Sequence, residues 1–158
     1  MNYIIREIKE SEYLLLNDFL YESIFVPEGT AVPPRSIIDI PELQVYVSEF
    51  GSKKDDHGLV AEVDGKIVGV AWVRIMNDYG HVDDETPSFA ISVYKDYQGL
   101  GIGKDLMQSM LVLLKKSGYK RASLSVQKAN YAVKMYQQLG FKVIAEKEEE
   151  YIMVIDLL

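Results

Sequence analysis

The sequence predicts a single-domain α/β fold, in which a mixed, largely antiparallel and twisted sheet is flanked by helices. The length of 158 residues suits one core, so we assign residues 1–158 to one domain. Hydrophobic residues make up 48% of the chain and charged residues 26%, which is typical of a folded globular protein. Segments of strand period interleave with segments of helical period, and this order predicts a sheet covered by helices.

The first third is expected to contribute one strand and two helices. Residues 3–8 alternate weakly between apolar and polar, which indicates a strand, and Ser11 is a candidate N-cap for a helix that extends to about residue 20. A second helix is expected from about residue 39 to about residue 50. The Pro-dense segment 32–35 between them is predicted to be a loop.

The middle of the chain predicts a hairpin. Residues 59–63 and 66–73 are apolar and flank Asp64-Gly65, a dipeptide suited to the positive φ angles of a tight turn. After a polar loop at 77–86, residues 89–93 are expected to form a buried strand.

The second half is expected to alternate helices and strands. Apolar side chains recur at helical spacing from Ile102 to Leu114, and Gly118 follows where a helix-ending glycine belongs. Asn130 can cap a further helix, which Gly140 would end. Strands are expected at residues 121–126, 141–146 and 151–157.

Composition excludes several classes of function. The chain has no cysteine, so a thiolate metal site or a cysteine nucleophile is excluded, and His57 and His81 are too far apart, in expected loops, to predict a metal site. The formal net charge of -7 argues against a nucleic-acid partner. The N-terminus lacks the features of a signal peptide and no apolar run reaches membrane-spanning length, so we expect a cytoplasmic protein with no membrane partner.

A glycine-rich segment between the expected strand at 89–93 and the following helix is the strongest chemical signal. Gly99, Gly101 and Gly103 leave backbone amides unobstructed at the positive end of the helix dipole, where an acidic protein can hold a pyrophosphate. The alternative is a flexible connection without a ligand, because such glycine patterns are common.

Two other phosphate-binding motifs do not fit this segment. A Walker loop needs a glycine where Gln98 stands and Ser or Thr where Asp105 stands. The dinucleotide fingerprint needs a third glycine where Lys104 or Leu106 stands. A nucleotide-binding regulatory domain is therefore a weak alternative.

The pattern Val93-x-x-x-Tyr97-Gln98-x-x-Gly101-x-Gly103 resembles the coenzyme A signature of the GNAT acyltransferase superfamily. A second pattern, Asn130-x-Ala132-x-x-x-Tyr136-x-x-x-Gly140-Phe141, is similar to the second signature of that family. The order of the expected elements matches the family over essentially the whole chain, although the N-terminal helices match in type and not in motif.

The resemblance implies an acetyl-CoA-dependent N-acetyltransferase. Acetyl-CoA would be a cosubstrate, with its pantetheine arm paired to the backbone around Ile91 and Val93, and the Val93 N–H would stabilise the oxyanion of the reaction. The pyrophosphate would bind backbone amides of the glycine-rich segment, which comprises Gln98, Gly99, Leu100, Gly101, Ile102, Gly103 and Lys104.

The resemblance implies functional roles for two residues of the second signature. Asn130 would cap its helix and contact the pantetheine, although a cap alone is the ordinary role of such a residue. Tyr136 would be the catalytic acid, because a phenol with a pKa near 10 is protonated at neutral pH and can donate to the departing thiolate. The alternative for Tyr136 is a ring packed against the sheet, and for Val93 a plain core residue.

The sequence does not identify the general base or the acceptor amine. Residues 87–92 lack the Glu or Asp that many family members carry there, and Asp83, Asp84 and Glu85 just upstream are not assigned as catalytic. Residues 20–50 and 75–87 are expected to border the acceptor. Acidic residues in these segments favour a cationic primary amine, whereas their alternative role is to keep the surface soluble. A homodimer and a non-catalytic acyl-CoA-binding sensor or interaction module both stay open.

Overall fold

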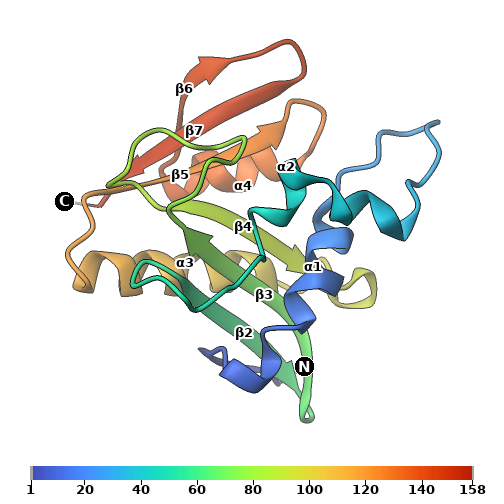
Figure 1. Ribbon diagram of the computed structural model, residues 1–158, viewed down its shortest axis with the longest axis vertical. Helices are drawn as coiled ribbons and strands as arrows, with labels where there is room; N and C mark the ends of the chain where they lie inside the picture. The colour runs from blue at the N-terminus through green and yellow to red at the C-terminus, as the bar shows by residue number, and fades with distance from the viewer. Residues whose placement is uncertain (1, 158) are drawn as a thin grey trace.

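A computed structural model of the chain describes residues 2–157 and contains a seven-stranded sheet (Figure 1). Its strands follow the spatial order β1-β2-β3-β4-β5-β7-β6. Their bounds are β1 Ile4–Glu7, β2 His57–Val63, β3 Lys66–Arg74, β4 Ser88–Val93, β5 Arg121–Gln127, β6 Lys142–Glu146 and β7 Glu150–Asp156. The α-helices are α1 Leu15–Ser23, α2 Pro41–Gln44, α3 Ile102–Lys116 and α4 Ala132–Leu139, and the 3₁₀ turns are η1 Glu10–Glu12, η2 Arg35–Asp39 and η3 Lys95–Tyr97.

The sheet is mixed and largely antiparallel, which confirms the predicted fold class. Each neighbouring pair is antiparallel except β4 and β5, which are parallel. The β4–β5 register contains only the pair Ser88↔Ser123, at the start of β4. Beyond this point β4 and β5 do not pair with each other within residues 2–157, and the sheet is split.

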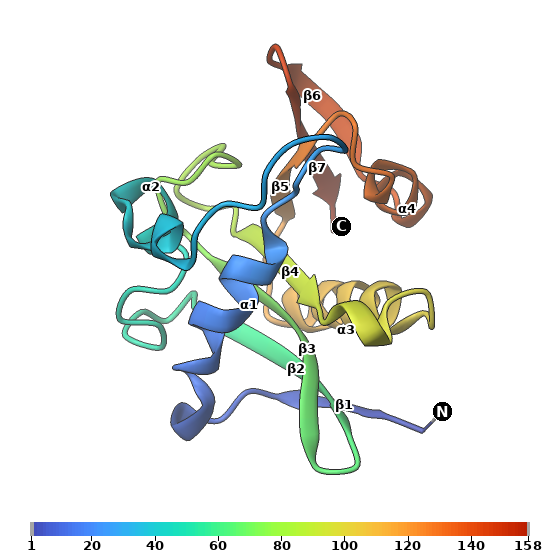
Figure 2. The same ribbon diagram turned by 90° about the vertical axis from the view of Figure 1, so that its right-hand side faces the viewer.

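Two layers of helices cover the sheet. Helices α3 and α4 lie on one face, and α1 with the segment around α2 lies on the other (Figure 2). Successive side chains of β3 point to opposite faces of the sheet and so pack against both layers. Ala71 and Val73 face the α3 side, whereas Val70 and Trp72 face the α1 side. All four side chains are fully buried.

The predicted hairpin is confirmed. Asp64 and Gly65 join β2 to β3 with φ angles of 49° and 80°, which are the positive angles that such a turn requires. Gly140 ends α4 with a φ of 111°, as its position predicted.

The prediction for the first helix was wrong at its start. Ser11 lies inside the short turn η1 and not at an N-cap, and α1 begins only at Leu15. The turn is held by Glu12, whose carboxylate accepts hydrogen bonds from the Lys9 N–H at 2.8 Å and from both terminal nitrogens of Arg6 at 2.9 and 2.8 Å.

The expected helix at 39–50 is also shorter than predicted. Only Pro41–Gln44 are helical, because side chains of β3 take carbonyls that a longer helix would use. Buried Arg74 donates to the carbonyls of Val45 and Ser48 at 3.0 and 2.7 Å, and Trp72 Nε1 donates to that of Tyr46 at 2.9 Å. In addition, His57 begins β2, where the sequence predicted a loop.

Candidate active site

The glycine-rich segment forms an open turn before α3. Gly99 and Gly101 have φ angles of 78° and 85°, and a Cβ atom on either would meet nothing within 4 Å. Glycine is needed there because other residues adopt this conformation only with strain. Gly103 differs, since its Cβ would make ordinary contacts of 3.8 Å with Ile91 and Val93.

The start of α3 has the geometry of an anion site. The first hydrogen bond of the helix runs from the Asp105 N–H to the Gly101 carbonyl at 3.1 Å. The amides of residues 102–104 precede that bond, so they have no partner within the helix. Lys104 and Leu100 are exposed beside them. Free amides at the positive end of a 15-residue helix can bind a phosphate group.

The free edge of β4 leads from this turn into the split in the sheet. Tyr94 N–H donates to the Val68 carbonyl of β3 at 2.9 Å. Successive N–H groups of a strand point to opposite sides, so the Val93 N–H points away from β3, toward the split. The Val93 carbonyl points the same way and accepts a hydrogen bond from Gln98 Nε2 at 2.9 Å.

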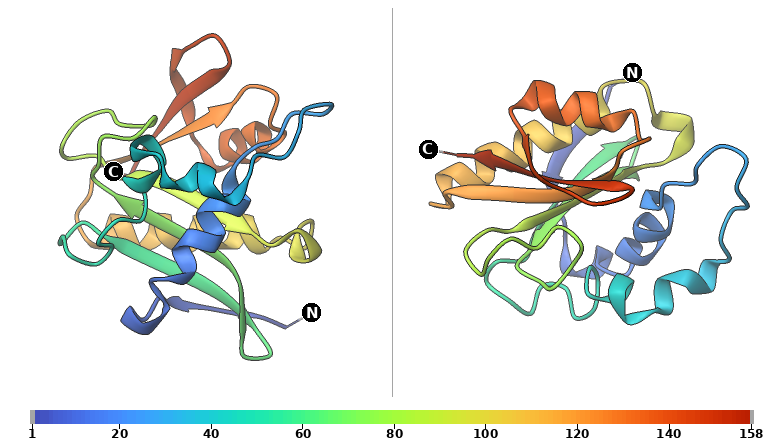
Figure 3. Two further views of the ribbon diagram at one scale, coloured as in Figure 1. Left: turned by 45° about the vertical axis from the view of Figure 1, so that its right-hand side comes forward. Right: turned by 90° about the horizontal axis from the view of Figure 1, so that it is seen from above.

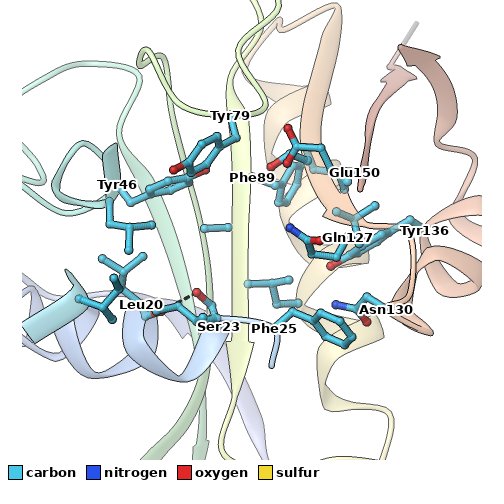
Figure 4. Close-up of a pocket in the computed structure, with 18 of the residues that line it drawn as sticks. Leu20, Ser23, Phe25, Tyr46, Tyr79, Phe89, Gln127, Asn130, Tyr136 and Glu150 are labelled. Atoms are coloured by element: carbon cyan, nitrogen blue, oxygen red, sulfur yellow. Dashed lines mark hydrogen bonds between the residues drawn. The ribbon is translucent and has the colours of Figure 1, made fainter. Parts of the chain in front are cut away.

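A cavity of about 510 Å³ opens at the split (Figure 4). Its walls come from distant parts of the chain. Residues 20–46 lie on the α1 side of the sheet, whereas α4 lies on the opposite side beside the ends of β5 and β7 (Figure 3). Both segments expected to border the acceptor contribute, through Leu20 to Tyr46 and through Tyr79.

The structure brings three of the predicted site residues together in this cavity: Ile91, Asn130 and Tyr136. Asn130 Oδ1 accepts a hydrogen bond from the Ala132 N–H at 2.9 Å, so Asn130 closes a turn at the start of α4, one residue before the N-cap Tyr131. The glycine-rich segment lies outside the cavity lining, at the other end of the free β4 edge.

Tyr136 is buried, with 7% of its surface exposed, and lines the cavity from α4. Its ring packs edge-on against Phe141 at a centroid distance of 6.0 Å, so the packing role suggested as an alternative also holds. Burial raises the pKa of the Tyr136 phenol to about 12. The hydroxyl is therefore protonated at neutral pH and available as a hydrogen-bond donor.

Tyr46 and Asp78 form a buried polar group beside the cavity. Tyr46 lines the cavity and is fixed through its own carbonyl by Trp72. Burial, and then the nearby Asp78 carboxylate, raises the pKa of the Tyr46 phenol. Burial also raises the pKa of Asp78, whose Oδ2 accepts a hydrogen bond from Ser88 Oγ at 2.5 Å.

The acidic residues selected from the sequence do not line this cavity. Asp83, Asp84 and Glu85 border a second cavity, with Arg121, which pairs with Asp83. The carboxylate that does line the first cavity is Glu150, which sequence reasoning missed. Glu150 ends a run of charged residues that begins at Lys147, and such a run is typical of a solvated turn. The pairing of β7 with β5 is what brings Glu150 to the cavity.

Other expected features can be compared with the described residues. Across residues 2–157, no group of three or more His, Asp or Glu side chains is placed to hold a metal ion. Over the same residues, none of the helices has the length and apolar character needed to cross a membrane.

The split sheet, the glycine turn and the helix start together are suited to an extended ligand that carries a phosphate group. The family model described as "Acetyltransferase (GNAT) domain" matches residues 24–155. The chain belongs to the GNAT acetyltransferase family.

Known proteins agree with this assignment. The chain is 29% identical over 107 residues to the [ribosomal protein bS18]-alanine N-acetyltransferase of Haemophilus influenzae, covering 65% of this chain and 69% of that protein. It is 31% identical over 114 residues to an N-alpha-acetyltransferase of Sulfurisphaera tokodaii, covering 62% and 68%. Other curated relatives are longer, and the chain spans only 37% of one and 30% of another.

A solved structure shares the fold. The paiA N-acetyltransferase of Thermoplasma acidophilum, in complex with coenzyme A, has 20% identity and a TM-score of 0.73, with 99% of each chain covered.

Proposed function

We propose that the chain transfers an acetyl group from acetyl-CoA directly to a primary amine, with both substrates bound at once. The observation that supports this most is the continuity of the site. Free amides at the start of α3, the free β4 edge and the cavity with Tyr136 follow one another along the split in the sheet. Family relatives named as N-acetyltransferases support the same activity.

The residues present fit acetyl-CoA. The amides of the glycine-rich segment from Gln98 to Lys104 would hold the pyrophosphate, and the β4 edge at Ile91 and Val93 would pair with the amide-containing pantetheine arm. Asn130 lines the cavity and can contact the same arm. Acetyl-CoA supplies the activated acetyl group as a thioester.

Backbone and phenol then act on opposite sides of the reacting carbonyl group. The acceptor nitrogen forms a bond to the carbonyl carbon, and the Val93 N–H donates to the carbonyl oxygen as it gains negative charge, which typically contributes about 3 kcal/mol. The carbon–sulfur bond breaks; the acceptor nitrogen, which has lost one proton to water before the attack, loses a second proton to water as the amide forms. The chain has no cysteine, so no acyl-cysteine intermediate forms.

Tyr136 acts as a hydrogen-bond donor to the leaving sulfur. Complete proton transfer from a phenol whose pKa is raised to about 12 to a thiolate whose thiol has a pKa of about 8.5 is uphill. The expected acid role is therefore refined: the hydroxyl stabilises the developing thiolate, and water protonates it after release. We place the acceptor, a cationic primary amine, in the rest of the cavity, and the enzyme in the cytoplasm.

Ligand-dependent melting tests the cosubstrate. Coenzyme A should raise the melting temperature, whereas ATP and NAD at the same concentration should raise it much less, because both lack the pantetheine arm. Gly101→Val should abolish the difference, since a β-branched residue at a φ of 85° cannot keep the turn.

Gly118→Val is the matched control, because Gly118 has a φ of 91°, nothing within 4 Å of its Cβ position, and a place at the opposite end of α3. It should lose stability but keep the response to coenzyme A. Equal stabilisation by ATP would contradict the cosubstrate. Binding of acetyl-CoA without acetyl transfer to any amine would favour the non-catalytic module instead.

A further inference from the structure

The cavity beside Tyr136 has a mixed lining of apolar side chains and neutral polar groups, with one carboxylate. Its acceptor side is formed by aliphatic and aromatic side chains, among them Phe25, Ile37, Leu43 and Tyr79. The polar groups of the lining are hydroxyls and amides. Among the described residues that line the cavity, Glu150 is the single charged one, and no Lys or Arg is among them.

Glu150 is held at the edge of the cavity by the sheet. It is the first residue of β7 and pairs with Gln127 at the end of β5, which lines the same cavity. Its side chain is only 17% exposed. Figure 4 shows its carboxylate on the side of the cavity that faces Tyr79, next to Phe89.

The carboxylate is incompletely neutralised by the protein. Within residues 2–157, its paired cation is Lys147, whose Nζ lies 3.5 Å from Glu150 Oε1. Hydrogen-bonded ion pairs are shorter, about 2.8 Å. The Lys147 side chain is 58% exposed, so a ligand cation can take its place without leaving a buried charge.

We infer that the acceptor is a primary amine carried on an apolar, preferably aromatic, group, and that Glu150 binds its ammonium ion. The inference rests on the proposed function and narrows its substrate. The single carboxylate of the lining can pair with one ammonium ion. The aliphatic and aromatic side chains of the walls can pack against the carbon skeleton of the amine. Polyamines fit poorly, because their additional ammonium ions would have no second carboxylate among the described lining residues, and amino sugars would place a hydroxyl-bearing ring against the aliphatic and aromatic walls.

Space limits the acceptor further. The cavity of about 510 Å³ must take the acetyl end of pantetheine as well as the acceptor. The part of the acceptor that enters is limited to the remaining volume, and a phenylethyl group fits within it. A free arylalkylamine and the α-amino group of a peptide with a large apolar first residue share this chemistry. The ammonium loses its proton to water at the open side of the cavity, so Glu150 is a binding residue.

Acceptor competition tests the inference. We would measure kcat and KM with acetyl-CoA and four acceptors: 2-phenylethylamine, a peptide amide beginning with Phe, spermidine and glucosamine. We expect kcat/KM for at least one apolar acceptor to exceed that for spermidine and glucosamine by tenfold or more. The better of the two apolar acceptors identifies the source of the amine. A preference for spermidine or glucosamine would overturn the inference.

Variants of Glu150 test its role. Glu150→Gln should raise KM for the apolar amine tenfold or more while changing kcat and the KM for acetyl-CoA less than threefold, and Glu150→Asp should restore part of the affinity. Glu149→Gln makes the same chemical change at the neighbouring exposed residue, outside the cavity lining, and should leave all constants unchanged. Equal effects of Glu150→Gln and Glu149→Gln would refute the assignment.

Calorimetry separates this inference from the proposed function. Binding of 2-phenylethylamine to the protein saturated with coenzyme A should weaken tenfold or more in Glu150→Gln. Binding with this dependence but without acetyl transfer would contradict the proposed function and support the amine site. Transfer to amines without this dependence would contradict the amine site alone.

Discussion

Tyr136 shows how burial changes what one residue can do. The sequence pattern identifies the tyrosine, but its buried position at 7% exposure, and the resulting rise of its pKa to about 12, come from the packed fold. The raised pKa keeps the hydrogen on the hydroxyl across the whole working range of pH. In the proposed reaction the phenol is therefore a hydrogen-bond donor to the thiolate and not a source of a free proton.

Tyr136→Phe should lower kcat by about 10²-fold, at the lower end of the range for a catalytic proton donor. The affinity for acetyl-CoA should change little, because the hydroxyl is needed when charge develops on sulfur. Single-turnover kinetics and calorimetry check the two parts. Tyr131→Phe, at an exposed tyrosine before α4, is the control and should behave as wild type. An unchanged rate of the chemical step would remove Tyr136 from catalysis.

The sequence predicted those site residues whose function depends on the local backbone. Gly99 and Gly101 have the positive φ angles of a turn, and Asn130 accepts a hydrogen bond from the Ala132 N–H; both features depend on a few neighbouring residues. Glu150 and Tyr46 escaped prediction because their role depends on distant pairings: β7 with β5, and the Tyr46 carbonyl with Trp72.

Charged side chains link three elements at the N-terminus. Arg6 in β1 binds Glu12 in η1 through two hydrogen bonds and Glu62 in β2 through one of 2.9 Å. This network explains why the chain forms a short turn where a helix was expected. It also lowers the pKa of Glu12 from 4.5 to about 2, chiefly through the Arg6 hydrogen bonds.

The stability of the protein should therefore depend on pH through Glu12. Its pKa is lower in the folded state than in the unfolded state, so its contribution to the free energy of unfolding is present above about pH 4.5 and is lost as the pH falls toward 2. Glu12→Gln should be destabilised most above pH 5 and should approach wild type near pH 2. Urea unfolding across this range measures the difference. Glu10→Gln, in the same turn, should show no such convergence, and parallel curves for Glu12→Gln would contradict the linkage.

At the scale of the whole molecule, the order of the strands was harder to predict than their existence. Periodicity predicted every strand and both long helices of the second half, but the parallel contact of β4 with β5 and the insertion of β7 between β5 and β6 depend on the assembled sheet. The split that results brings Tyr136 and Glu150 to one cavity. A one-dimensional pattern contains the segments but not this juxtaposition.

The net charge of -7 acts over the whole surface and should favour a cationic acceptor during encounter. KM for 2-phenylethylamine should rise as salt increases from about 0.02 M to about 0.5 M, because the Debye length falls from roughly 20 Å to roughly 4 Å. Phenylalanine, the matched acceptor with an added carboxylate, has no net charge and should show a weaker dependence. Steady-state assays with both acceptors measure the effect.

A combined Asp83→Asn and Asp84→Asn variant separates the long-range field from local binding. These two residues border the second cavity, so removing their charges leaves the lining of the first cavity intact. KM for 2-phenylethylamine should rise at low salt and match wild type at high salt, where screening has already removed the field. A difference that persists at high salt would mean that Asp83 and Asp84 act locally. A KM that is independent of salt, or a preference for the acceptor with a carboxylate, would show that the surface charge does not steer the amine.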